Sequence, residues 1–140
     1  MNREPDLGTL LREMKPVLHP GEYVFCTLDE TPDLAHNEAL AWFREAEGLS
    51  LIATRSQADA RGWTYGFVGA WITLTVESPL ESVGLTAAVS RALADAGISC
   101  NVVAAYHHDH IFVPLEVAGR ALDILKGVSR AARHGRGRAA

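Results

Sequence analysis

The segment that decides the fold is Trp71–Pro114, WITLTVESPLESVGLTAAVSRALADAGISCNVVAAYHHDHIFVP. Three runs rich in β-branched residues predict strands, at 71–76, 99–106 and 111–113. Between the first two strands the sequence predicts a helix that ends at Gly97 and turns apolar residues spaced by four towards the core: Leu85, Val89 and Leu93. The order strand, helix, strand, strand indicates the first part of a βαββαβ unit.

The same signals predict the remaining elements. They are a helix over 6–15 with Asp6 as N-cap, strands over 22–28, 49–54 and 63–76 (the last interrupted near Gly66 and Gly69), a polar turn or single helical turn over 56–62, and a helix over 116–133. Residues 34–47 are predicted to form a further helix, which buries Leu40 and Phe43 and ends at Gly48. The chain therefore mixes short strands with helices along its whole length.

A short pattern occurs in both halves of the chain. Glu47–Ser50 and Ala96–Ser99 each combine a helix end, a glycine, an apolar strand entry and a serine. The similarity reflects either two fused copies of one small α/β unit or chance, since glycine is common at the ends of helices.

Charge and composition exclude several classes of protein. The 140 residues carry a net charge of −4, although the segment after residue 125 is basic, with Lys126, Arg130, Arg133, Arg136 and Arg138 and no acid. The acidic remainder argues against a nucleic-acid partner, and the basic segment is either a solvated terminus or a contact for an anionic partner. No apolar run is long enough to span a membrane, and the N-terminus lacks the apolar core of a signal peptide, so we expect a cytoplasmic protein.

Side chains that support catalysis are present but poorly placed. Cys26 and Cys100 lie in apolar strand-like runs without metal-ligand spacing, so we expect buried, reduced thiols. Buried thiols ionise poorly, which disfavours a nucleophilic cysteine paired with His108 or His110. The sequence has no phosphate-binding loop or dinucleotide fingerprint. We therefore expect neither an enzyme nor a bound cofactor, and we assign no catalytic residue.

Five aromatic residues are expected in the core rather than on a base-stacking surface: Trp42, Phe43, Trp63, Phe67 and Trp71.

The run His107-His108-Asp109-His110 suggests a metal site at first sight. Adjacent strand residues point to opposite faces, so His108 and His110 can share a face while His107 cannot. Because no second cluster of ligands completes a coordination sphere, we interpret the run as a polar hairpin turn and predict no metal.

The loop between the first strand and the helix, residues 77–86, is the preferred binding site. The start of a helix presents unpaired N–H groups that suit a carboxylate, and Gly84 lets a ligand approach the backbone. Ser78, Pro79 and Glu81 fit a capping box, with Ser82 as a rival cap. Asn101 is a polar residue in an apolar strand. The alternative is that Gly84 serves packing and Asn101 satisfies a strand edge.

Five segments together support a family resemblance. They are Ala41–Ile52, Trp71–Thr75, Val83–Val89, Gly97–Val103 and Tyr106–Pro114, of which the last three are specific as a set. Over roughly residues 20–126 the chain resembles the small bacterial proteins built from two tandem ACT-like units. This resemblance implies an α+β fold of two ferredoxin-like (βαββαβ) units with antiparallel sheets. The implied boundaries are an N-terminal helix over 1–16, a first ACT-like unit over 17–68, a second ACT domain over 69–128 and a basic flexible tail over 129–140.

The resemblance also implies a role. ACT domains typically bind amino acids or related metabolites between units and shift an equilibrium in an attached enzyme or partner, and the tandem arrangement is similar to that of cytosolic arginine sensors in animals. The implied ligand-binding residues are Glu81, Ser82, Val83, Gly84, Leu85, Asn101 and Val103. The ligand carboxylate is expected at the backbone of Ser82–Leu85, with Asn101 and Glu81 taking the ammonium. Open sheet edges favour a homodimer. The main alternative is an interaction module that binds no ligand and docks a protein through its sheet edge.

Overall fold

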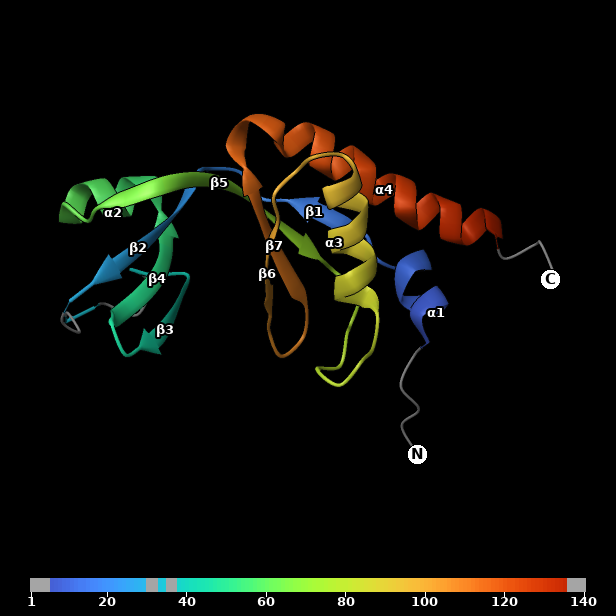
Figure 1. Ribbon diagram of the computed structural model, residues 1–140, viewed down its shortest axis with the longest axis horizontal. Coiled ribbons are helices and arrows are strands. Elements are labelled where there is room, and N and C mark those ends of the chain that lie inside the picture. The colour runs from blue at the N-terminus through green and yellow to red at the C-terminus, as the bar shows by residue number, and fades with distance from the viewer. Residues whose placement is uncertain (1–5, 30–32, 35–37, 136–140) are drawn as a thin grey trace. The chain divides into compact units, whose positions relative to one another are not determined.

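The computed structural model describes residues 6–29, 33–34 and 38–135 (Figure 1). The chain forms two compact units, which we call the terminal unit (residues 1–19 and 71–140) and the inserted unit (residues 20–70). Residues 1–19 thus belong with the C-terminal half of the chain and not with the segment that follows them.

The described residues of the inserted unit form a four-stranded sheet with one short helix. Its elements are β2 (Tyr23–Leu28), β3 (Ala41–Glu45), β4 (Gly48–Thr54), α2 (Arg55–Arg61) and the first part of β5 (Tyr65–Leu74). The strand order is β3-β4-β2-β5, and all the neighbouring strands are antiparallel. One face of this sheet packs against α2 and forms the core of the unit, in which Val24, Leu51 and Ala58 are buried.

The terminal unit carries the longer helices. Its elements are α1 (Leu7–Arg12), β1 (Pro16–Leu18), the second part of β5, α3 (Leu85–Asp95), β6 (Asn101–Ala104), β7 (Asp109–Pro114), a short 3-10 turn η1 (Leu115–Val117) and α4 (Ala118–Gly135). The strand order is β1-β5-β7-β6. In this unit α4 packs against α1, α3 and β1 (Figure 1). Residues 129–135 belong to α4, where the Ser129 hydroxyl donates a hydrogen bond of 3.1 Å to the Arg12 carbonyl.

Both units have the strand order of a ferredoxin-like sheet, in which the fourth strand lies beside the first and the third separates the first from the second. In the inserted unit the four strands are β2, β3, β4 and β5 in chain order. In the terminal unit they are β5, β6, β7 and then β1, so the N-terminus supplies the fourth strand. The expected α+β fold of two ferredoxin-like units is confirmed. The strand β5 contributes to both units.

The predicted helix over 34–47 is wrong. Residues 41–45 form the edge strand β3, paired with β4 from Ala41 opposite Ile52 to Glu45 opposite Gly48, and residues 35–37 lie outside the described part of the chain. Leu40, Trp42 and Phe43 are exposed, the last two by 62% and 73%, so the expectation that they are buried is also wrong. The apolar residues of this segment are too few to distinguish a period of 3.6 from a period of 2.

Predictions about local geometry are also corrected at Gly48, at the start of α3 and in β5. Gly48 closes a hairpin at φ +148° instead of ending a helix. The N-cap of α3 is Gly84, not Ser78 or Ser82, and no side chain caps this helix. The strand is continuous over Tyr65–Leu74, without the predicted interruption, but its pairing with β2 is irregular next to Gly66. Val24 pairs with Val68 and Cys26 with Tyr65, so β5 has one extra residue in this interval.

Several predicted elements are present with small shifts of boundary. Asp6 caps α1 by accepting a 2.8 Å hydrogen bond from the Thr9 N–H. The helix α3 buries Leu85, Val89 and Leu93, as their spacing predicts. The hairpin of β6 and β7 lies where the two C-terminal apolar runs place it.

Candidate functional site

The loop between β5 and α3 is held by the turn between β6 and β7. The Ser78 N–H donates to the His107 carbonyl at 3.1 Å, and His107 Nδ1 lies 2.9 Å from Glu77 Oε1. His108 Nδ1 donates to the Val76 carbonyl at 2.9 Å. The first two histidines of the His-His-Asp-His run therefore fix the shape of the predicted binding loop.

The helix α3 begins at this loop without a side-chain cap. Gly84 occupies the N-cap position at φ +102°, in the left-handed region that favours glycine. A Cβ added to Gly84 would lie 3.0 Å from Cδ2 of Leu7, so α1 packs close to this backbone. The N–H groups in the first turn of a helix have no intrahelical partner, and here no side chain of the N-cap satisfies them.

Ser82 lies two residues before this N-cap. Its Oγ is buried and has no hydrogen-bond partner, and no other buried side-chain oxygen or nitrogen in the described part of the chain lacks one. A buried hydroxyl without a partner costs roughly 1–3 kcal/mol of stability. The predicted loop therefore combines an unsatisfied hydroxyl with an uncapped helix start.

The other predicted loop residues differ in exposure. Leu85 is buried in the core, so only its backbone is available to a ligand. Val83 is 86% exposed, and two further apolar side chains at this end of the unit, Leu80 and Tyr106, are 64% and 78% exposed. Glu81 is also exposed.

Asn101 and Val103 lie on the edge strand β6, and Asn101 lies at the end of this strand that is away from the loop. Asn101 pairs with Phe112, at the end of the β6–β7 ladder away from the turn, whereas Ala104 pairs with Asp109 beside the turn. Three residue steps in a strand separate these ends by roughly 10 Å. Residues 101 and 103 share one face, as alternation requires.

Comparison with known proteins shows to which family the chain belongs. Two family models, both described as ACT domain, match residues 3–70 and 67–127, and their overlap falls in β5, which both units use. The chain belongs to the tandem ACT-domain family. No functionally curated protein gives a significant match.

Solved structures agree with this assignment. A Vibrio cholerae protein of unknown function, described as a possible transport protein, is 44% identical, with a TM-score of 0.76 over 88% of this chain and 95% of its own. An Agrobacterium tumefaciens protein is 18% identical, with a TM-score of 0.66 over 84% of this chain and 90% of its own. The ligand-free regulatory subunit of aspartate kinase from Thermus thermophilus is 10% identical, with a TM-score of 0.61 over 83% of this chain and 97% of its own. The last two show the ACT fold alone.

The sheet of the terminal ACT unit carries a histidine network that sequence reasoning missed. His19 Nε2 lies 2.7 Å from the Thr73 hydroxyl, which lies 3.0 Å from His110 Nδ1. The Trp71 indole N–H donates to the same His110 nitrogen at 3.1 Å, and His19 stacks on Trp71 with ring centroids 3.6 Å apart. Because the indole can only donate, His110 Nδ1 is an acceptor and the ring is neutral.

This network predicts lower stability of the ACT-domain protein in acid. Burial, followed by the charges of His108 and His19, lowers the pKa of His110, and burial also lowers the pKa of His19. Below the ordinary histidine pKa of about 6.5 the unfolded chain takes up protons that the folded rings resist, so stability falls as pH falls through that value. Urea denaturation at about pH 7.5 and about pH 5.5 measures this loss. His110→Gln, which keeps an acceptor for the indole, is expected to reduce it, and an equal loss in the variant would contradict the assignment.

The two cysteines of this ACT-domain protein do not pair with each other. Cys26 and Cys100 are both free, and burial raises the pKa of each thiol. Among the residues that the structure describes, no three His, Cys, Asp or Glu side chains form a group that could hold a metal ion. None of the described helices has the length and apolar character required to cross a bilayer.

Proposed function

We propose that this protein is a regulatory ACT-domain protein that binds a free amino acid in the loop between β5 and α3 and acts by binding, not by catalysis. ACT domains are in general regulatory modules for small molecules, which supports the class of ligand. The observation that carries the proposed site is the buried, unpaired Ser82 hydroxyl next to the uncapped start of α3.

The loop suits the carboxylate of an amino acid. The helix start offers N–H donors and a partial positive charge, and Ser82 Oγ–H adds one donor beside them. The exposed carboxylate of Glu81 is in position to attract the ammonium. The ligand thus replaces the missing partner of Ser82 and caps α3 at the same time.

Asn101 and Val103 join the site from a second copy of the chain in this proposal. They lie on β6, the last strand in the sheet of the terminal unit, and Asn101 lies at the end of β6 away from the turn that holds the loop. Edge strands pair readily with further strands, so a homodimer formed along β6 would bring both residues to a neighbouring site. Ligand binding between the copies would then change how they dock. The proposed compartment is the cytoplasm, where thiols such as Cys26 stay reduced.

Thermal unfolding with each proteinogenic amino acid tests the proposal. A ligand at 100 times its Kd adds about 2.7 kcal/mol, which raises the Tm of a chain of this size by several degrees. A cooperative melt that no amino acid shifts would contradict the proposal. That result would favour the interaction module, for which the exposed Trp42 and Phe43 on the edge strand β3 offer a contact surface.

The variant Ser82→Ala tests whether the Ser82 hydroxyl binds the ligand or only supports the fold. Removing an unsatisfied buried hydroxyl is expected to stabilise the free protein by about 1 kcal/mol, while the shift caused by the amino acid is reduced or lost. Ser90→Ala is the matched control, because the Ser90 hydroxyl already donates to the Thr86 carbonyl at 2.6 Å. It is expected to keep the full shift. If Ser82→Ala destabilises the free protein and keeps the shift, the assignment is wrong.

A further inference from the structure

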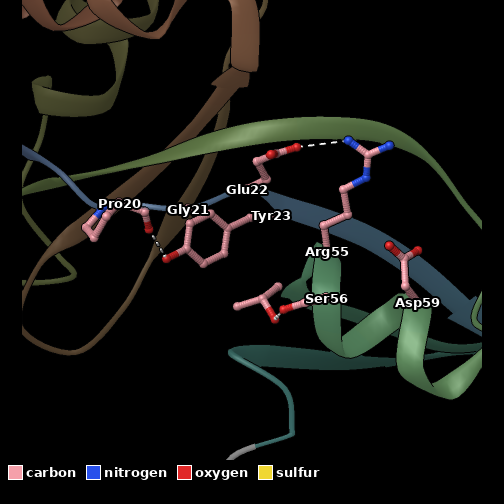
Figure 2. A pocket seen from close by; sticks show the side chains of 8 residues that line it. Pro20, Gly21, Glu22, Tyr23, Arg55, Ser56 and Asp59 are labelled. Carbon is pink, nitrogen blue, oxygen red and sulfur yellow. Dashed lines mark hydrogen bonds and ion pairs between the residues drawn. The ribbon is translucent and has the colours of Figure 1, made fainter.

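The inserted unit has an open surface pocket of about 340 Å³, called the cavity below, that shares no residue with the proposed loop site. Three segments line it: the turn that leads into β2 (Pro20–Tyr23), the junction of β4 and α2 (Thr54–Ser56), and Asp59 on α2 (Figure 2). Its volume is at the lower end of the range of roughly 300–1,000 Å³ for ligand pockets, which fits a ligand of amino-acid size.

The walls of the cavity are fixed by hydrogen bonds. The Tyr23 hydroxyl donates to the Pro20 carbonyl at 2.8 Å, which holds the ring against the turn (Figure 2). The Arg55 N–H donates to the Glu22 carbonyl at 2.9 Å and joins the turn to the start of α2. Thr54 forms a capping box with that helix. The cavity is therefore formed in the free protein and needs little ordering to bind.

The polar groups of the cavity have both signs of charge. Arg55 Nη1 donates to Glu22 Oε1 at 2.9 Å, and both side chains remain about half exposed. Arg55 Nε donates to the Tyr65 hydroxyl at 3.0 Å, which in turn donates to Asp59 Oδ1 at 2.7 Å. The Arg55 guanidinium is thus paired directly with Glu22 and is linked to Asp59 through the Tyr65 hydroxyl, and it has N–H groups beyond the two used in these contacts.

We propose that this cavity is a second binding site, specific for small zwitterions of the free amino-acid class. The planar guanidinium of Arg55 is suited to a ligand carboxylate, and Asp59 and Glu22 are suited to its ammonium. The two carboxylates disfavour a phosphate or another purely anionic ligand. The lining also includes apolar surface, to which Pro20 and the ring of Tyr23 contribute, and its volume favours a ligand with a small side chain. This inference goes beyond the proposed function, because it gives the inserted unit a site of its own.

Amide resonances of the ¹⁵N-labelled full-length protein test this inference. Each proteinogenic amino acid is added singly at millimolar concentration, and an N-acetylated amino acid amide, which lacks both charges, serves as the neutral probe. At least one amino acid is expected to shift the amides of Gly21, Glu22 and Ser56, and the neutral probe is not. If no amino acid shifts them, or if the neutral probe shifts them equally, the inference is overturned.

Arg55→Met and Arg61→Met form a matched pair. Arg61 lies on the same helix and pairs with Glu38, outside the cavity. Arg55→Met is expected to weaken binding at least about tenfold, as for loss of a hydrogen bond to a charged group, whereas Arg61→Met leaves it unchanged. Ser56→Trp, at an exposed position of the lining, blocks the cavity without touching the core and is expected to abolish the shifts.

The two sites are distinguished by Ser82→Ala. This variant is expected to leave the shifts at Gly21 and Ser56 intact, because Ser82 belongs to the terminal unit. Binding at the cavity that survives Ser82→Ala, is weakened at least about tenfold by Arg55→Met and is abolished by Ser56→Trp supports the second site, whatever the result at the loop. Shifts that disappear in Ser82→Ala, or that have the same amino-acid dependence in Arg55→Met as in the unmodified protein, overturn it.

Discussion

Replacing Leu10 and Met14 together by alanine is expected to unfold the terminal unit at moderate temperature. Both side chains are fully buried although they come from the first residues of the chain. Truncating a buried leucine or methionine to alanine costs about 2–5 kcal/mol, so the pair costs about 4–10 kcal/mol, which is comparable to the whole stability of a typical domain. Chemical denaturation followed by circular dichroism measures the loss.

The control for this experiment is the pair Glu13→Ala and Lys15→Ala, at exposed positions among the same residues. It is expected to change the free energy of unfolding by less than about 1 kcal/mol. If the buried pair behaves like this control, the N-terminal segment is not an integral part of the unit that contains Ser82, and the described fold of that unit is wrong.

Gly48→Ala is expected to destabilise the inserted unit by about 3–5 kcal/mol, from two separate costs. A Cβ at this position would lie 2.4 Å from the Leu28 carbonyl oxygen, which is backbone and cannot move aside cheaply. The backbone φ of +148° is also unfavourable for alanine. A thermal melt or urea titration of the purified variant measures the sum of the two costs.

Gly62→Ala separates the two costs. Gly62 also has a positive φ, +69°, but a Cβ there would meet no atom within 4 Å. Its substitution is therefore expected to cost only the conformational strain, about 1–2 kcal/mol. Equal losses at the two glycines would show that the close approach of Leu28 to Gly48 is not present in solution.

The elements that the sequence predicts correctly are those with a long, regular apolar pattern. The period of Leu85, Val89 and Leu93 defines α3, and the β-branched runs define β2, β4 and the hairpin of β6 and β7. The tandem ferredoxin-like fold follows from these elements and from the resemblance they support.

Two elements could not be predicted because their signals are too short or too distant. Pro16–Leu18 has only three residues, and it is a strand because β5 lies opposite it. Residues 41–45 contain Trp42 and Phe43, which suit the inner face of a helix and a strand equally well. Only the pairing with β4 decides between the two, and pairing is a tertiary interaction.

The candidate sites also depend on tertiary interactions that the sequence alone does not show. The loop before α3 is recognisable from Gly84 and its neighbours, but the unpaired state of Ser82 depends on how the loop folds back on the β6–β7 turn. The cavity at Arg55 joins residues more than thirty positions apart, such as Glu22, which pairs with Arg55 across 33 positions. No local motif marks such a pair.

Binding in the loop is tested most directly by a crystal structure of the protein with the amino acid that raises its Tm most. We expect ligand density with a carboxylate oxygen about 2.7–3.2 Å from Ser82 Oγ or from an N–H in the first turn of α3. Density that leaves Ser82 Oγ and the start of α3 without a ligand contact would show that the amino acid does not bind in this loop.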